Sequence, residues 1–267
     1  MEYSEEFKEA IEFCKVKNLF LGYGNPNGKI LMIGKEQYFN SISTNDTDEF
    51  YKELLEKRNK VNQININSWL KNINENFIPK WDERQECFCD DSNALTAWWN
   101  QKNKQNNKNN GGTSNTYLQY QKIYQNVFND SIKQDNINFQ KEFFITELSD
   151  LVAKKDYQFP RLKELKKGYV LERQELFKLP FFKSFPIIVI ASGHYSKDFD
   201  VNLEKVFDVK WKNETTSVGK SWINLHDSSN PKNKKLLIHT RQLSTSVETE
   251  LIERLSNEIN KFLKSLI

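Results

Sequence analysis

Short, unbroken apolar runs constrain the fold of this chain more than any other sequence feature. They occupy residues 30–33, 143–146, 187–191 and 236–238. Such runs are typical of strands buried on both faces, as in a parallel sheet covered by helices. Apolar residues at helical spacing occupy residues 46–58, 116–128 and 246–266. The alternation predicts an α/β protein, a three-layer α/β/α sandwich with a mainly parallel central sheet.

The two ends of the chain carry clear helix signals. Near the N-terminus, Phe7, Ile11 and Cys14 recur at helical spacing, and Ser4 is suited to cap that helix. Residues 246–266 carry one long apolar stripe. Thr245 with Glu248 matches a capping box ahead of it.

A long stretch separates the first two apolar runs, but nothing in it marks a second domain. We expect one domain over residues 1–267, with a helical, Asn-rich insertion at about 40–140. Its polar, low-complexity centre predicts a loop. Lysines in that centre could touch nucleic acid, but a loop of this composition is more often simply solvated.

Composition limits the class of protein. A net charge of +3 permits a local basic patch but does not by itself indicate a polyanionic partner. No apolar run reaches the length of about 18 residues that a membrane span requires, and the acidic, polar N-terminus does not resemble a signal peptide. Three cysteines are too few for a disulfide framework, which predicts a reducing, cytoplasmic location.

In open α/β sheets, ligands bind beyond the carboxyl ends of the strands. Four polar segments follow the apolar runs and should meet there if the sheet is parallel. They are GKEQYF at 34–39, TELSD at 146–150, SGHYS at 192–196 and HTRQLS at 239–244.

The first of these segments places an acid and two rings at a strand end. Gly34 allows the backbone to turn, and Glu36 would project into a cleft, where it could orient or deprotonate a water. Tyr38 and Phe39 offer flat faces for a nucleobase. The alternative is that both rings belong to the core and Glu36 to the surface.

The last segment is basic and precedes a helix. Residues 228–247 carry no acid, and a basic stretch before a helix N-terminus suits phosphate. His239 could donate a hydrogen bond to a developing anion, or be a satisfied structural histidine. Leu243, an apolar residue in a basic loop, could wedge between bases. The basic residues are Lys232, Lys234, Lys235 and Arg241.

Together these motifs resemble the uracil-DNA glycosylase superfamily. GYGNPNGKILMIGKEQ is similar to the opening of its bacterial and archaeal branch, and GKEQYF to the Gly-Gln-Asp-Pro-Tyr-His motif of its best-known branch. HTRQLS is similar to that branch's His-Pro-Ser-Pro-Leu-Ser loop. The likeness is close at these motifs, vague over 140–200 and absent from the insertion.

The resemblance implies hydrolysis of the N-glycosidic bond of uracil or another altered base in DNA. The nucleotide is flipped into a pocket, and the base leaves as an anion. Glu36 would stabilise the sugar cation and position water, and His239 would stabilise the base anion. Gly34, Tyr38, Phe39 and Glu147 are the expected base-binding residues. The expected DNA-binding residues are Lys232, Lys234, Lys235, Arg241, Gln242, Leu243 and Ser244.

Three residues depart from the family pattern. Gln37 stands where the motif has proline, and Phe39 where it has histidine. Glu147 lies where the family often has an asparagine that reads uracil, and a carboxyl group offers both a donor and an acceptor only when protonated. These departures favour an alternative: an inactive member that binds DNA or a protein through the same cleft.

Metal sites and other chemistries are weaker interpretations. The iron–sulfur branch uses four spaced cysteines, and Cys14, Cys87 and Cys89 do not supply them, so we expect no cluster, metal or cofactor. Zinc on the Cys87–Cys89 pair with a histidine is an alternative. His226 and Asp227 suit a turn or a metal, and residues 192–194 lack a serine hydrolase elbow. A small-molecule nucleosidase is a third functional candidate.

Overall fold

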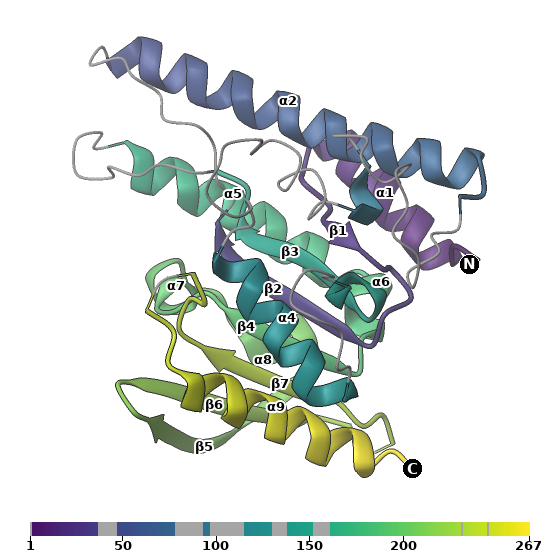
Figure 1. Ribbon diagram of the computed structural model, residues 1–267. Coiled ribbons are helices and arrows are strands. Elements are labelled where there is room, and N and C mark those ends of the chain that lie inside the picture. The colour runs from purple at the N-terminus through teal and green to yellow at the C-terminus, as the bar shows by residue number, and fades with distance from the viewer. Residues whose placement is uncertain are drawn as a thin grey trace, which may run out of the picture.

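The computed structural model describes residues 2–36, 47–77, 93–96, 115–129, 138–151, 161–230, 232–244 and 246–267. These residues form one seven-stranded sheet in the order β1-β3-β2-β4-β7-β6-β5 (Figure 1). The strands are β1 (Tyr23–Gly24), β2 (Ile30–Glu36), β3 (Phe143–Ser149), β4 (Ile187–Ala191), β5 (Val209–Val218), β6 (Ser221–Ser228) and β7 (Leu236–Thr240).

The sheet is mixed, with parallel pairing only at its centre. Strands β3, β2, β4 and β7 run parallel to one another. Strand β1 pairs antiparallel with β3, β6 with β7, and β5 with β6. The expected α/β class is confirmed, and the expected parallel arrangement holds for the four central strands alone.

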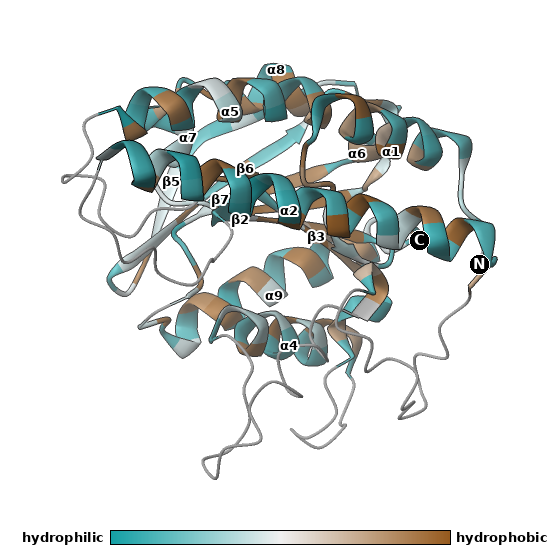
Figure 2. Cartoon of the chain, turned by 90° about the horizontal axis from the view of Figure 1, so that it is seen from above, coloured by the Kyte–Doolittle hydropathy of each residue, from teal (hydrophilic) through white to brown (hydrophobic). Residues whose placement is uncertain are grey.

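Helices cover both faces of the sheet (Figure 2). On one face, α4 and α9 pack over the side chains of Ile30, Met32 and Val189. On the other, helices including α1, α2, α5 and α6 pack over Leu31 and Ile188. The helices are α1 (Glu5–Lys17), α2 (Thr47–Asn74), α4 (Asn115–Phe128), α5 (Leu162–Phe177), α6 (Pro180–Ser184), α7 (Tyr195–Asp198), α8 (Leu203–Phe207) and α9 (Thr249–Lys264), with 3-10 turns η2 (Ala94–Thr96) and η3 (Phe139–Lys141).

Local sequence accounts for the ends of the helices unequally. The Ser4 side chain accepts a hydrogen bond from the Phe7 N–H, so the expected cap of α1 is confirmed. Helix α9 begins after Glu248, which makes no side-chain cap; its carboxylate instead accepts from the Lys220 N–H. The capping-box interpretation is therefore wrong for Glu248, and Thr245 lies outside the described residues.

The described parts of the expected insertion are integral to the sheet's two cores. Trp69 of α2 is fully buried against Phe7 and Phe144. On the opposite face, Tyr120 and Ile123 of α4 belong to the core that α9 completes. Segments 47–77 and 115–129 thus cover different faces of one sheet and form no separate lobe.

The sequence carries no signal that predicts the hairpin of β5 and β6. Strand β5 is an edge strand whose central residues are exposed, so it lacks the apolar run that marks a buried strand. His226 and Asp227 lie within β6, so the turn interpretation is wrong for them; Asp227 pairs with Lys212 at 2.9 Å. Among the described helices, none is both long and apolar enough to cross a bilayer.

Replacing Trp69 tests whether α2 belongs to the core. Trp69→Ala removes the buried ring and the 2.9 Å hydrogen bond that its Nε1–H donates to Gly22 O. The substitution should lower the free energy of unfolding by about 3–5 kcal/mol. Ile64→Ala, on the same helix but 42% exposed, should change it by less than about 0.5 kcal/mol. If denaturant unfolding gave equal, small losses of unfolding free energy for the two variants, α2 would be peripheral to the core.

Candidate functional site

The parallel centre of the sheet brings four strand ends to one edge, called here the carboxyl edge. Helix α7 lies beside it (Figure 1). Ile33, Ile190 and His239 are partners across β2, β4 and β7, and Glu36 lies three residues beyond Ile33. With strands about 4.8 Å apart and a rise of about 3.3 Å per residue, the Cα atoms of Glu36 and His239 are about 14 Å apart.

Glu36 ends β2 in a buried ion-pair cluster. Its Oε2 atom accepts hydrogen bonds from Lys166 Nζ at 2.9 Å and from the Tyr195 hydroxyl at 2.6 Å. Lys166 also lies 3.1 Å from the Tyr195 hydroxyl and is fully buried, whereas the Glu36 side chain is 18% exposed. Among described contacts, Oε1 has only Lys35 Nζ, at 4.0 Å. One carboxylate oxygen is thus fixed by two donors, and within the described residues the other has no hydrogen bond.

Lys166 is a site residue that the sequence analysis missed. It lies on α5 among buried residues at helical spacing, with Leu162 and Val170 one turn away on either side. A lysine on an apolar helix face could have indicated a buried partner, because an unpaired buried charge is costly. Neighbouring lysines in the same helix hid that signal.

Gly34 and Glu147 are neighbours across β2 and β3. A Cβ built on Gly34 would lie 2.1 Å from Glu147 Oε2, so glycine is what lets this carboxyl group lie over the end of β2. The two expected base-binding residues therefore meet at the carboxyl edge. Tyr38 and Phe39, expected to join them, lie outside the described residues.

Burial raises the pKa of the Glu147 carboxyl group. Desolvation raises its pKa to about 8; the Arg173 charge opposes this rise and the Glu36 charge adds to it. Two tyrosines of α4, Tyr117 and Tyr120, have pKa values raised by burial and, less, by the Glu147 charge. The Tyr120 hydroxyl is buried and makes no hydrogen bond with the described residues. At neutral pH the Glu147 carboxyl is mostly protonated, and it can both donate and accept a hydrogen bond.

His239 is buried against a backbone carbonyl. Its Nε2 lies 2.9 Å from Gly193 O and 3.3 Å from Ser196 Oγ, and the Trp222 ring packs edge-on at 4.9 Å. Burial lowers its pKa to about 4, so the ring is neutral near pH 7. Since a carbonyl oxygen can only accept, Nε2 carries the proton and donates it to Gly193 O.

Helix α7 joins the two ends of the candidate site. Tyr195 holds Glu36, and the next residue, Ser196, contacts His239. These two contacts bring together segments more than two hundred positions apart in the sequence.

A second buried network fixes the end of β3. The Asp150 carboxylate accepts from Arg58 Nε at 3.0 Å and Nη2 at 2.9 Å, and both side chains are almost fully buried. Arg173 donates to Glu147 O and Thr146 Oγ1, each at 2.7 Å, and to Phe20 O. These bonds tie α2 and α5 to the strand that carries Glu147.

The expected DNA-binding residues do not gather at one place. Leu243 is fully buried in the core beneath α9, so in this structure it is not available to enter a base stack. The lysines precede β7 and lie at the opposite edge of the sheet from Glu36; Lys235 is buried on Phe207 O and Lys234 bonds to Ser265 O. Lys232 belongs to the same turn, and its backbone N–H donates a hydrogen bond to Asn230 Oδ1. The partly buried residues that follow β7 at the carboxyl edge are Arg241, Gln242 and Ser244.

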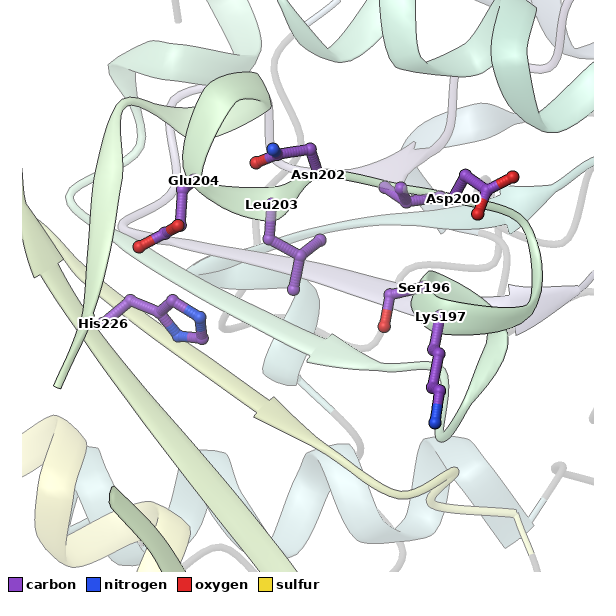
Figure 3. Close-up of a pocket in the computed structure, with 8 residues that line it drawn as sticks. Ser196, Lys197, Asp200, Asn202, Leu203, Glu204 and His226 are labelled. Carbon is purple, nitrogen blue, oxygen red and sulfur yellow. The ribbon is translucent and has the colours of Figure 1, made fainter. Parts of the chain in front are cut away.

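A surface cavity of about 480 Å³ lies between α7, α8 and β6 (Figure 3). Ser196, Glu204 and His226 line it, whereas Glu36 and His239 do not. Burial lowers the pKa of His226, and its Nδ1 has no hydrogen-bond partner in the described structure. The described residues hold no group of three or more metal-ligating side chains, and Cys87 and Cys89 lie outside them.

The raised pKa of Glu147 predicts a pH-dependent stability. The folded protein keeps this proton after the unfolded chain has lost it, so the stabilisation is complete below about pH 4.5 and is lost as the pH rises through about 8. Glu147→Gln should abolish this loss, worth about 1.4 kcal/mol per unit of pKa difference. Denaturant unfolding at several pH values measures it. Glu175→Gln, at an exposed position of α5, is the control and should follow the wild type.

Comparison with known proteins adds no relative to this picture. No protein-family model matches the chain, and no curated protein matches its sequence. The family likeness therefore rests on the motifs around Glu36 and His239, and the chemistry of the site has to be inferred from its own geometry.

Proposed function

We propose that this chain is a DNA glycosylase-like protein that hydrolyses the N-glycosidic bond of uracil or another altered base in DNA. The observation that supports it best is the pair of contacts made by α7, through Tyr195 to Glu36 and through Ser196 to His239. They link the acid and the histidine that the family chemistry requires, at the carboxyl edge where α/β proteins bind ligands.

The same proposal covers the finer fold class, a three-layer sandwich of the uracil-DNA glycosylase type. Helices on both faces and a parallel centre of four strands support it. The antiparallel hairpin of β5 and β6 and the two-residue strand β1 would then be additions at the edges of the sheet.

In the proposed reaction, water adds to the sugar carbon as the bond to the base breaks. Glu36 orients this water through Oε1 and accepts a proton from it. The base departs as an anion and takes up a proton afterwards. Neutral His239 stabilises that anion when its Nε2–H exchanges Gly193 O for an oxygen of the base. Gly193, at φ +61°, adopts the left-handed conformation in the turn where this exchange would occur.

Glu147 supplies base recognition in this proposal. A protonated carboxyl group donates from its hydroxyl and accepts at its carbonyl, which matches the O4 acceptor and N3–H donor of uracil. The difficulty raised by a glutamate in place of an asparagine disappears when the group is neutral, and its pKa of about 8 keeps it so at neutral pH. Arg241, Gln242 and Ser244 remain candidates for the DNA backbone.

A second candidate is an inactive member of the family that binds DNA or a protein through the same cleft. The specific observation that favours it is the ion pair of Glu36 with Lys166, which compensates the charge that would stabilise a sugar cation. Salt-dependent DNA binding without base release, unchanged by Glu36→Gln, would identify this function.

Base release from oligonucleotides tests the first candidate. Purified protein should release a base from at least one member of a panel containing uracil and damaged bases. Glu36→Gln should lower the rate by about 10²–10⁴-fold while leaving DNA binding intact, because it removes only the group that activates water. Glu164→Gln, exposed on α5, is the control and should act as the wild type. No release from the whole panel would count against hydrolysis.

The pH dependence of uracil release tests the role of Glu147. Ionisation above about pH 8 removes its donor, so wild-type release should decline there. Glu147→Gln keeps a donor and an acceptor at every pH, and its release should not show this decline. Identical alkaline profiles for the two proteins would exclude Glu147 from base recognition.

A further inference from the structure

We propose that Lys166 is a positioning residue for Glu36, acting with Tyr195 to fix which carboxylate oxygen faces the reaction. This inference rests on the proposed hydrolytic function. No motif of the sequence pointed to Lys166, which the fold alone brings from α5 to the end of β2.

The geometry of the contacts supports this role. Both donors reach the same oxygen, Oε2, at 2.9 Å and 2.6 Å, and they also touch each other at 3.1 Å. A carboxylate held by two donors on one oxygen cannot rotate without breaking both charge-assisted bonds. Oε1 is therefore the oxygen presented to water.

Burial makes the arrangement rigid. Lys166 is fully buried, so bulk water does not compete with Glu36 for its ammonium group. Tyr195 is 8% exposed and packs against Phe199, with ring centroids 4.8 Å apart. The Lys35 ammonium group also packs over the Tyr195 ring, with Nζ 4.3 Å from the ring centre. Each partner of Glu36 is itself held in place.

The charge balance refines the role of Glu36. Lys166 at 2.9 Å and Lys35 at 4.0 Å compensate the charge of Glu36, so Glu36 contributes less by attracting a sugar cation than by orienting water. Loss of Lys166 should then lower turnover, because the Glu36 carboxylate would hold the attacking water less precisely. Substrate binding should change little.

Kinetics of paired variants test this role. Lys166→Met should lower kcat by about 10- to 100-fold with KM nearly unchanged, less than the loss caused by Glu36→Gln. Lys166→Arg, which keeps a positive charge, should recover part of the lost kcat. Lys166→Ala should be rescued by added ethylammonium, which supplies a cation, but not by ethanol, which does not. Lys167→Met is the matched control, since its partner Asp200 is exposed, and it should act as the wild type. Melting curves establish that each variant is folded.

A second measurement separates failure of this inference from failure of the proposed function. In ¹⁵N-labelled wild type, the Lys166 ammonium should give a slowly exchanging NMR signal that Glu36→Gln abolishes and Lys167→Met does not. Wild-type turnover with equal rates for Lys166→Met and Lys167→Met would overturn the positioning role alone. The NMR signal without any wild-type turnover would overturn the hydrolytic function and, with it, the positioning role, leaving a structural ion pair.

Discussion

The parallel hydrogen-bond register of β3, β2, β4 and β7 is the constraint on which the candidate site depends. It sets Ile33, Ile190 and His239 in one row and so carries the ends of β2 and β7 to the same edge. Reversing β2 alone would send Glu36, and reversing β7 alone would send His239, to the opposite edge of the sheet. Helix α7 then needs only two adjacent residues to touch both.

Several ionisable groups are buried around that edge, and Asp150, Lys166 and Arg173 each have a defined compensation. Asp150 is held by Arg58, and Lys166 by Glu36, whereas Arg173 is satisfied largely by backbone carbonyls. Glu147 is the exception, because desolvation outweighs the Arg173 charge and leaves it protonated near neutral pH. Removing one partner of a buried pair typically costs about 3–5 kcal/mol, so these pairs make the edge stiff but sensitive to substitution.

Features with a strong local signal could be predicted from the sequence. The four central strands were marked by their apolar runs, and the positions of Glu36 and His239 followed from where those runs end. Features set by tertiary contacts could not: Lys166 is one lysine among several until α5 docks, and Leu243 reads as a loop residue until α9 covers it. The exposed strand β5 carries no hydrophobic period at all, since its edge position imposes none. The lysines before β7 lie close to His239 in the sequence, but the length of β7 separates them in space.

The described segments of residues 40–140 lie on opposite sides of the sheet, which limits how this region could have arisen. Excising these segments would uncover Phe144 on one side and Phe143 on the other, because Trp69 packs against the first and Tyr120 against the second. A shortened relative would therefore need compensating changes in both layers, and truncation at this region is a poor route to a minimal version of the protein.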